Sequence, residues 1–204
     1  MSVPAGHDPT EPYQAKTIGP RLDRADYAVA AMTASIYLGH GMSGAAASMA
    51  SFVAGLERRG IAAHAIDLPK RRAEEAVPAF RSIVPTGAGI AVGGHSYGGR
   101  VASLALAETP DAWAGLVLFS YPLHRPGKPA FEERTSHWPR ITRPVLLLSG
   151  ESDPFARIDL LRRAVEQLPL GELVTYPRLG HTLKPMLDDA LDRTAAFLLG
   201  LSGR

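Results

Sequence analysis

Short apolar runs alternate along the chain with longer stretches of helical periodicity, and this alternation restricts the possible folds more than any other feature. Several runs are apolar at every position, as in strands that are covered on both faces. The pattern predicts an α/β fold with a mostly parallel central sheet and helices on both faces. The expected strands are 34–38, 61–66, 89–92, 115–119, 145–148 and 173–176. The expected helices are 45–59, 72–84, 97–107, 158–167 and 185–199.

Length and composition indicate one globular domain. A chain of 204 residues, of which 46% are hydrophobic and 21% are charged, can bury a core of its own. Residues 1–20 contain four prolines and few large apolar side chains. We therefore expect a flexible N-terminal tail over 1–20, followed by a single domain over 21–204.

Charge and cysteine content exclude several classes of protein. The formal net charge is only +2, which does not favour a nucleic-acid partner. Cysteine is absent, which excludes disulfides, thiolate metal sites and a cysteine nucleophile. No apolar run approaches the ~20 residues that a membrane span needs, and the N-terminus lacks the pattern of a secretory signal. We expect a cytoplasmic protein, a monomer or a homodimer, with no membrane partner.

The segment GHSYG, residues 94–98, matches the pattern G-x-S-x-G between an expected strand and an expected helix. In that setting the serine occupies a tight turn with strained backbone angles, and the flanking glycines prevent collisions with neighbouring elements. The pattern alone is weak, since a glycine-rich loop can contain a serine by chance. The strand before it and the helix after it favour Ser96 as a nucleophile.

A serine nucleophile needs a base, and His181 is the best placed of the seven histidines. It follows the last expected strand and precedes the final helix, so that it can reach back over the end of the sheet. The other histidines lie in the tail, in a strand pattern, beside turns or in an irregular segment: His7, His64, His40, His95, His124 and His137. A structural loop histidine is the alternative interpretation of His181.

The base needs an acid to orient it, and the expected order along the chain is serine, acid, histidine. Asp153 follows the strand 145–148 in the loop SGESDP and satisfies that order. Glu151, two residues earlier, is the competing candidate. Asp153 could also serve only an Asx turn before Pro154, a common structural role.

The turn that follows the first strand, GHGMSG at residues 39–44, can expose backbone amides because its glycines have no side chains to block them. We expect the amides of Met42 and Tyr97 to form an oxyanion hole. Taken alone, this turn would be read as a flexible loop. We also expect His40 to lie at the pocket edge.

The chain resembles the α/β-hydrolases, and more narrowly a small dienelactone-hydrolase-like group that includes testis-expressed protein 30 and a regulatory subunit of a histone acetyltransferase complex. The segments that carry the resemblance are GHSYGGRVAS (94–103), SYPLHRPGKP (120–129), RTSHWP (134–139), SGESDPF (149–155) and GHTLKP (180–185). The resemblance implies an α/β-hydrolase fold, with Ser96 as nucleophile, Asp153 as acid and His181 as base. Dienelactone hydrolases use a cysteine nucleophile, so their substrate is not carried over. Some relatives act as complex subunits, which keeps a non-catalytic scaffold as an alternative.

These features predict a serine hydrolase that cleaves a small-molecule ester or thioester without a cofactor; a peptidase is a further alternative. The segment 121–143 is too short for a lid domain, and Tyr121 and His124 are expected to edge the pocket. Basic residues there, Arg125 and Lys128 among them, favour an acidic acyl substrate or are simply solvated. The mixed charges at 70–75 indicate a solvated helix face. No His, Asp or Glu group has metal-ligand spacing.

Overall fold

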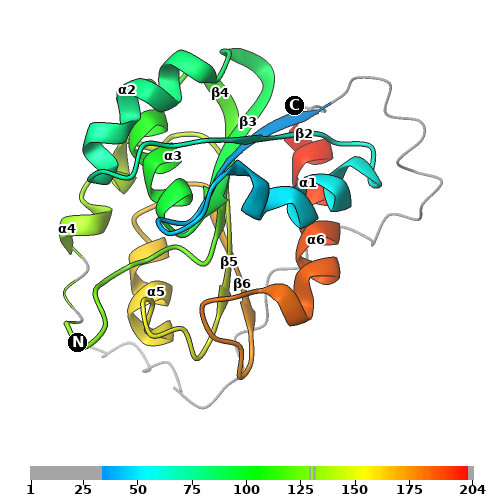
Figure 1. The fold of residues 1–204 in the computed structure, drawn as a ribbon. Helices are drawn as coiled ribbons and strands as arrows, with labels where there is room; N and C mark the ends of the chain where they lie inside the picture. The colour runs from blue at the N-terminus through cyan, green and yellow to red at the C-terminus, as the bar shows by residue number, and fades with distance from the viewer. Residues whose placement is uncertain (1–33, 129, 131, 202–204) are drawn as a thin grey trace, which may run out of the picture.

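Six parallel strands form the centre of the computed structural model, which describes residues 34–128, 130 and 132–201 (Figure 1). Their lateral order is β2-β1-β3-β4-β5-β6, and every neighbouring pair is parallel. The strand order reverses between β1 and β3, the place where ligands collect in open α/β sheets. The strands are β1 (Ser35–Gly39), β2 (Ala62–Ile66), β3 (Gly87–His95), β4 (Trp113–Phe119), β5 (Val145–Gly150) and β6 (Gly171–Tyr176).

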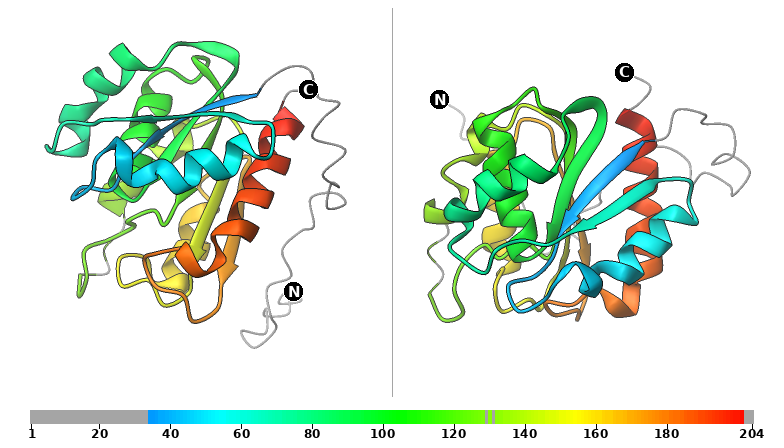
Figure 2. Two further views of the ribbon diagram at one scale, coloured as in Figure 1. Left: turned by 45° about the vertical axis from the view of Figure 1, so that its right-hand side comes forward. Right: turned by 45° about the horizontal axis from the view of Figure 1, so that its top comes forward.

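Helices cover both faces of the sheet (Figure 2). One face carries α2 (Ala73–Ile83), α3 (Tyr97–Glu108) and α5 (Ile158–Val165), and the other carries α1 (Ala50–Glu57) and α6 (Leu187–Leu201). The predicted α/β class is confirmed, and each predicted strand and helix is present with its ends displaced by a few residues. The short helices are η2 (Ala46–Met49), α4 (Glu132–Thr135), η3 (Trp138–Arg140) and η4 (Lys184–Met186).

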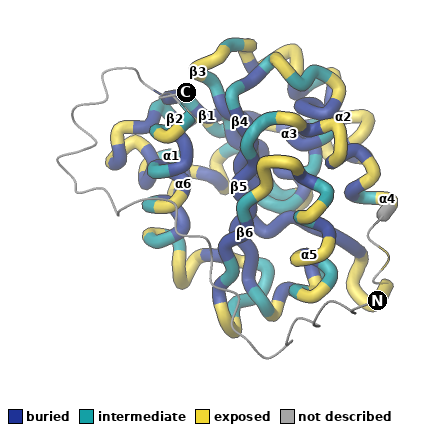
Figure 3. Tube along the Cα trace, turned by 180° about the vertical axis from the view of Figure 1, so that it is seen from behind, coloured by how far each residue is buried: buried dark blue, intermediate teal, exposed yellow. Residues whose placement is uncertain are grey.

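Two apolar layers lie between the sheet and the helices, because successive residues of a strand point to opposite faces. In β4, Leu116 and Leu118 face the layer under α2, α3 and α5, whereas Val117 and Phe119 face α1 and α6. All four side chains are fully buried, and Figure 3 shows β4 and β5 buried along most of their length. Burial of each such side chain stabilises the fold by about 1.5–3 kcal/mol. Because both of its faces are covered, β4 is apolar at every position.

The connection between β4 and β5 is irregular, as predicted, apart from the short helices α4 and η3. Its aromatic side chains Tyr121 and Trp138 are buried and pack edge to face, with ring centroids 5.0 Å apart. Its described residues form no lid domain over the end of the sheet. The predicted tail at 1–20 lies outside the described residues. None of the helices described is both long enough and apolar enough to cross a bilayer.

Three glycines bring the backbones of β1, β3 and α3 together. A Cβ on Gly98 would lie 2.2 Å from the carbonyl carbon and oxygen of Gly39, and one on Gly94 would lie 2.4 Å from the same oxygen. The atoms in the way belong to the backbone, which cannot rotate aside as a side chain can. The N–H of Gly98 also donates a hydrogen bond to the carbonyl of His40 at 2.9 Å. The turn after β1 is therefore fastened to the start of α3.

Gly98→Ala should lower the free energy of unfolding by about 3 kcal/mol, because the added methyl group displaces the backbone of β1. Gly89→Ala, in β3, is the matched control, since a Cβ there meets nothing within 4 Å. The control should change the free energy of unfolding by less than about 1 kcal/mol. Denaturant titration measures both values. Equal losses in the two variants would contradict the close approach.

A buried histidine lies under the connection between β4 and β5. His137 is 3% exposed, and its Nε2 lies 2.8 Å from Oγ of Ser103 in α3. Burial, together with the charges of Arg100 and Arg140, lowers the pKa of His137 to about 4, although Glu74 acts in the opposite direction. The imidazole is therefore neutral in the folded protein at neutral pH, and it takes up a proton more readily after unfolding.

Acid should destabilise the fold between about pH 6.5 and pH 4, because the unfolded chain binds a proton at His137 in this range and the folded chain does not. Between pH 7 and pH 5, the wild type should lose about 2 kcal/mol more unfolding free energy than His137→Gln. Denaturant titrations of both proteins at the two pH values measure the difference. The same pH dependence in both proteins would refute the assignment to His137.

Candidate active site

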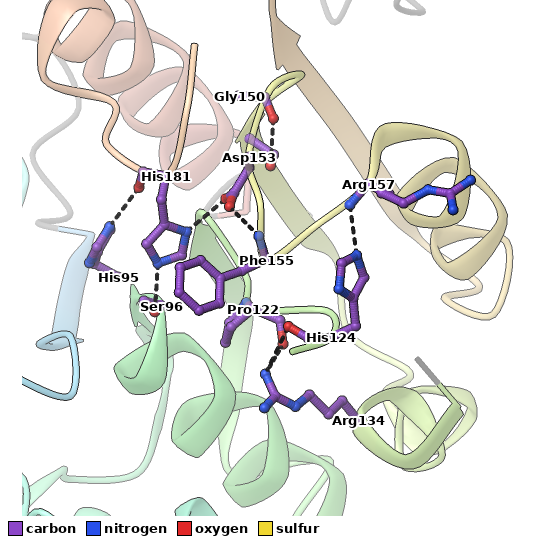
Figure 4. Close-up of polar contacts among 11 residues, drawn as sticks. His95, Ser96, Pro122, His124, Arg134, Gly150, Asp153, Phe155, Arg157 and His181 are labelled. Atoms are coloured by element: carbon purple, nitrogen blue, oxygen red, sulfur yellow. Dashed lines mark hydrogen bonds and ion pairs between the residues drawn. The ribbon is translucent and has the colours of Figure 1, made fainter. Parts of the chain in front are cut away.

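Ser96 occupies the turn between β3 and α3, at the carboxyl end of the sheet (Figure 4). Its φ of 52° and ψ of −113° are strained for a residue that has a side chain. The N–H of Ser96 donates to the carbonyl of Phe119 at 2.9 Å, which ties the turn to β4. The strand–turn–helix setting predicted from the G-x-S-x-G pattern is present, and it presents the hydroxyl at the edge of the sheet.

His181 lies in the loop after β6 and joins Ser96 to Asp153. Its Nε2 is 2.9 Å from Oγ of Ser96, and its Nδ1 is 2.7 Å from Oδ2 of Asp153. Ser96 follows β3, Asp153 follows β5 and His181 follows β6. Parallel strands place these loops at one edge of the sheet, so residues 85 and 28 positions apart in the chain meet in one hydrogen-bonded chain.

Asp153 determines which nitrogen of His181 carries the proton. The Asp153 side chain is fully buried, and its Oδ1 accepts a hydrogen bond from the N–H of Phe155 at 2.8 Å. An ionised carboxylate can only accept, so the hydrogen bond at Oδ2 comes from Nδ1–H of His181. The lone pair of Nε2 is then directed at the Ser96 hydroxyl, as a general base requires.

Glu151, the competing acid, has other partners. Its Oε1 accepts a hydrogen bond from Oγ1 of Thr175 at 2.9 Å and lies 3.5 Å from Nη2 of Arg162. These contacts hold Glu151 against β6 and α5. Of the two acids in this loop, the structure brings Asp153 to His181.

Two residues that the sequence did not single out also contact His181. Nε2 of His95, the residue before Ser96, lies 3.2 Å from the carbonyl oxygen of His181. A carbonyl oxygen can only accept, so Nε2–H of His95 is the donor, and burial lowers the pKa of His95, which favours the neutral ring. The ring of Phe155 lies 4.6 Å from the ring of His181. The sequence marks these two residues only by their positions: His95 comes one residue before Ser96, and Phe155 comes two residues after Asp153.

A cavity of about 600 Å³ opens beside Ser96, a volume that suits a small molecule. Met42 and Tyr97, the residues expected to supply oxyanion amides, both line it. Since Tyr97 is the first residue of α3, its N–H has no acceptor within the helix. Arg72 and Glu74 also line the cavity, although the sequence predicts a solvated face there. The charged start of α2 thus belongs to the site.

Three residues expected to contact substrate are buried away from the cavity lining. His40 and Tyr121 are 1% exposed and His124 is 3% exposed, and none of them lines the cavity. Both ring nitrogens of each histidine, and the hydroxyl of Tyr121, are hydrogen-bonded to backbone groups. This corrects the expectation from the sequence: the residues do lie beside the ends of strands, but their side chains turn inward and support the loops.

The groups assembled around Ser96 are an imidazole, a buried carboxylate and a largely basic wall. Within 34–128, 130 and 132–201, no three His, Cys, Asp or Glu side chains gather closely enough to hold a metal ion. A hydroxyl that is hydrogen-bonded to an oriented imidazole can attack an electrophilic carbonyl carbon.

Solved structures of other proteins share this fold. A monoacylglycerol lipase from Paleococcus ferrophilus has a TM-score of 0.71 at 18% identity, over 82% of this chain and 94% of its own. Est1E from Butyrivibrio proteoclasticus, with ferulic acid bound, has a TM-score of 0.70 at 16% identity, over 85% and 91%. A thioesterase domain from the curacin biosynthetic pathway has a TM-score of 0.63 at 13% identity, over 82% and 91%.

The sequence itself matches the model of a protein family, described as the alpha/beta hydrolase domain, over residues 33–197. The match includes all six strands and the loops that hold Ser96, Asp153 and His181. The six-stranded parallel sheet between two layers of helices agrees with it. The chain therefore belongs to the α/β-hydrolase family.

Proposed function

We propose that this protein is a serine hydrolase that cleaves a carboxylic ester or a thioester through an acyl-enzyme intermediate. The observation that carries the proposal is the hydrogen-bonded chain from Asp153 through His181 to Ser96, with contacts of 2.7 Å and 2.9 Å beside an open cavity. The similarity of the fold to a lipase, to Est1E and to a thioesterase domain supports esters and thioesters as the substrate class.

In the first half of the reaction, Oγ of Ser96 attacks the carbonyl carbon of the substrate while Nε2 of His181 takes the hydroxyl proton. The π electrons of the carbonyl move onto its oxygen, and a tetrahedral intermediate forms. When the intermediate collapses, the bond to the alcohol or thiol breaks and the leaving group receives the proton from His181. The acyl group is then esterified to Ser96.

Asp153 stabilises the imidazolium that exists between these two proton transfers. Its carboxylate is buried and receives a second hydrogen bond from the N–H of Phe155, so the oxygen facing His181 is held in position. The negative charge stays on Asp153 throughout, because the carboxylate orients and stabilises the ring without taking its proton.

The amides of Tyr97 and Met42 are proposed to hold the oxyanion. The N–H of Tyr97 lies at the start of α3, where the helix dipole favours negative charge. The turn that contains Met42 is held by the hydrogen bond from Gly98 to His40 at 2.9 Å. Such amides are positioned before the reaction begins, so stabilising the oxyanion requires no reorganisation.

Water completes the cycle. It attacks the carbonyl carbon of the acyl-enzyme, and His181 takes one of its protons. A second tetrahedral intermediate collapses, the bond to Oγ breaks, and the proton returns to Ser96. The products are a carboxylic acid and a regenerated hydroxyl.

Ser96→Ala should lower kcat for 4-nitrophenyl butyrate and for an S-butyryl thioester by at least about 10³-fold, because no nucleophile remains. A fluorophosphonate probe should label Ser96 in the wild type, as peptide mass spectrometry would show. Ser82→Ala, at an exposed site on α2, is the control and should retain full activity. A wild type that binds these esters but neither cleaves them nor takes up the probe would instead be a non-catalytic binding module.

Asp153→Asn should lower kcat by about 10³- to 10⁴-fold, since the amide cannot hold the imidazole in the required tautomer. Glu151→Gln is the matched control, because it makes the same chemical change two residues away, at a carboxylate bonded to Thr175. The control should retain activity within about tenfold of the wild type. The same loss in both variants, measured as kcat on one ester, would contradict the assignment of the acid.

A further inference from the structure

Basic side chains dominate the wall of the cavity beside Ser96. The whole chain has a formal net charge of only +2, yet the basic residues on this wall outnumber the acidic ones by five to two. A cavity lined mainly by one sign of charge raises the local concentration of ligands of the opposite sign. The five basic residues are Arg72, Arg100, Arg125, Lys128 and Arg134.

Two of these cations are partly buried, and they differ in their partners. Nη2 of Arg100 lies 2.5 Å from Oε1 of Glu74, so its charge is paired within the protein. Arg134 is half-buried, and no carboxylate lies within 4.0 Å of it among the side chains that the structure describes. Arg134 is therefore the cation whose charge an incoming anion could pair.

Backbone carbonyls of the segment after β4 hold one nitrogen of the Arg134 guanidinium. Its Nη1 donates to the carbonyl of Pro122 at 2.7 Å and lies 3.5 Å from the carbonyl of His124. The hydroxyl of Tyr121 donates to the carbonyl of Arg134 at 2.6 Å. The first two contacts fix the side chain of Arg134 to the segment that follows β4, and the third fixes its backbone there. Its Nε and Nη2 donate to no described residue, and they remain available for a ligand.

The direction of Arg134 suits a ligand bound at Ser96. Figure 4 shows its guanidinium end pointing toward Pro122, on the opposite side of Phe155 from His181. Pro122, Phe155 and Arg134 all line the cavity that Ser96 also lines. An ester whose carbonyl lies at Ser96 can therefore extend along this wall toward the guanidinium.

The charges near Arg134 also favour an anion. Burial and the positive charges of Arg100 and Arg125 lower the pKa of Arg134, whereas Tyr121 and Glu133 act in the opposite direction. The protonated guanidinium is thus partly desolvated and repelled by its neighbours in the free protein. A carboxylate beside it would offset that repulsion and could accept two parallel hydrogen bonds from the planar fork.

We propose that Arg134 forms a carboxylate-binding subsite of the cavity, so that the enzyme selects esters or thioesters that carry a carboxylate several bonds from the carbonyl that is cleaved. The selection by turnover rests on the proposed hydrolase function. The subsite itself rests on the cavity wall and on the free donors of Arg134. The carboxylate could belong to the acyl part or to the alcohol part of the substrate. One pair of esters for each position distinguishes these two cases.

The first test compares esters in matched pairs. The mono-4-nitrophenyl ester of adipic acid and 4-nitrophenyl hexanoate differ only in a terminal carboxylate on the acyl chain; phenyl acetate and its 4-carboxymethyl derivative differ in a carboxylate on the leaving group. In at least one of the two pairs, the wild type should have a kcat/KM about tenfold higher for the charged ester than for the neutral one. Arg134→Gln should abolish this preference while changing kcat/KM for the neutral ester less than about twofold, and Arg134→Lys should keep part of it.

Arg163→Gln removes the same charge from an exposed position on α5, outside the cavity wall, and should leave the preference unchanged. A wild type without preference in either pair would overturn the proposal. An equal loss of both esters in Arg134→Gln would also overturn it, because that result assigns Arg134 only to support of the loop.

The second test measures binding without turnover. Monomethyl adipate and methyl hexanoate are titrated by calorimetry into the Ser96→Ala protein and into the Ser96→Ala, Arg134→Gln double variant. The loss of Arg134 should raise the Kd of monomethyl adipate about tenfold and leave that of methyl hexanoate unchanged. If the wild type cleaves no ester and takes up no fluorophosphonate, the hydrolase proposal fails, and this titration still decides the subsite. An equal affinity of monomethyl adipate for the Ser96→Ala protein and for the double variant would refute the carboxylate subsite.

Discussion

The fold depends on one close approach, that of the β1, β3 and α3 backbones at Gly39, Gly94 and Gly98. A larger residue at Gly94 or Gly98 would separate these elements, because the atoms that its side chain would meet are backbone atoms. The approach occurs where the strand order reverses, so it brings the turn after β1 to the first turn of α3. It also leaves room only for a tight turn at Ser96, whose φ of 52° reflects that limit. One packing constraint thus positions the hydroxyl and the amides of the proposed oxyanion hole together.

Two buried histidines, His40 and His124, support the loops around the active site with matching sets of hydrogen bonds. Nε2 of His40 accepts a hydrogen bond from the amide of Leu68 at 3.0 Å, and Nε2 of His124 accepts one from the amide of Arg157 at 3.0 Å. In each ring Nδ1–H donates to the carbonyl of the next residue, which makes the imidazole neutral. Uncharged imidazoles therefore support the loops, whereas the cavity wall carries cations. Among the side chains that the structure describes, Arg134 is the half-buried cation of this wall with no carboxylate beside it.

Much of the fold and three of the site residues could be predicted from the sequence. Apolar runs located each strand that the structure describes, but the run at 89–92 marks only the middle of β3, which spans Gly87–His95. The glycine-rich ends of that strand have no side chains from which a pattern could be read. Ser96, Asp153 and His181 could be chosen because each follows a strand, and the carboxyl ends of parallel strands share one edge. The structure joins all three by hydrogen bonds.

By itself the sequence determined the class of fold, the order of its elements and the edge of the sheet at which reactive groups gather. Only the tertiary structure decided that Asp153 and not Glu151 meets His181, that His40 turns inward, and that Arg134 shares a cavity wall with Ser96. The physical reason is that a sequence pattern is local, whereas these contacts are not. Periodicity reports whether a residue faces a core, whereas the direction of a loop side chain and the pairing of charges depend on contacts between segments far apart in the chain.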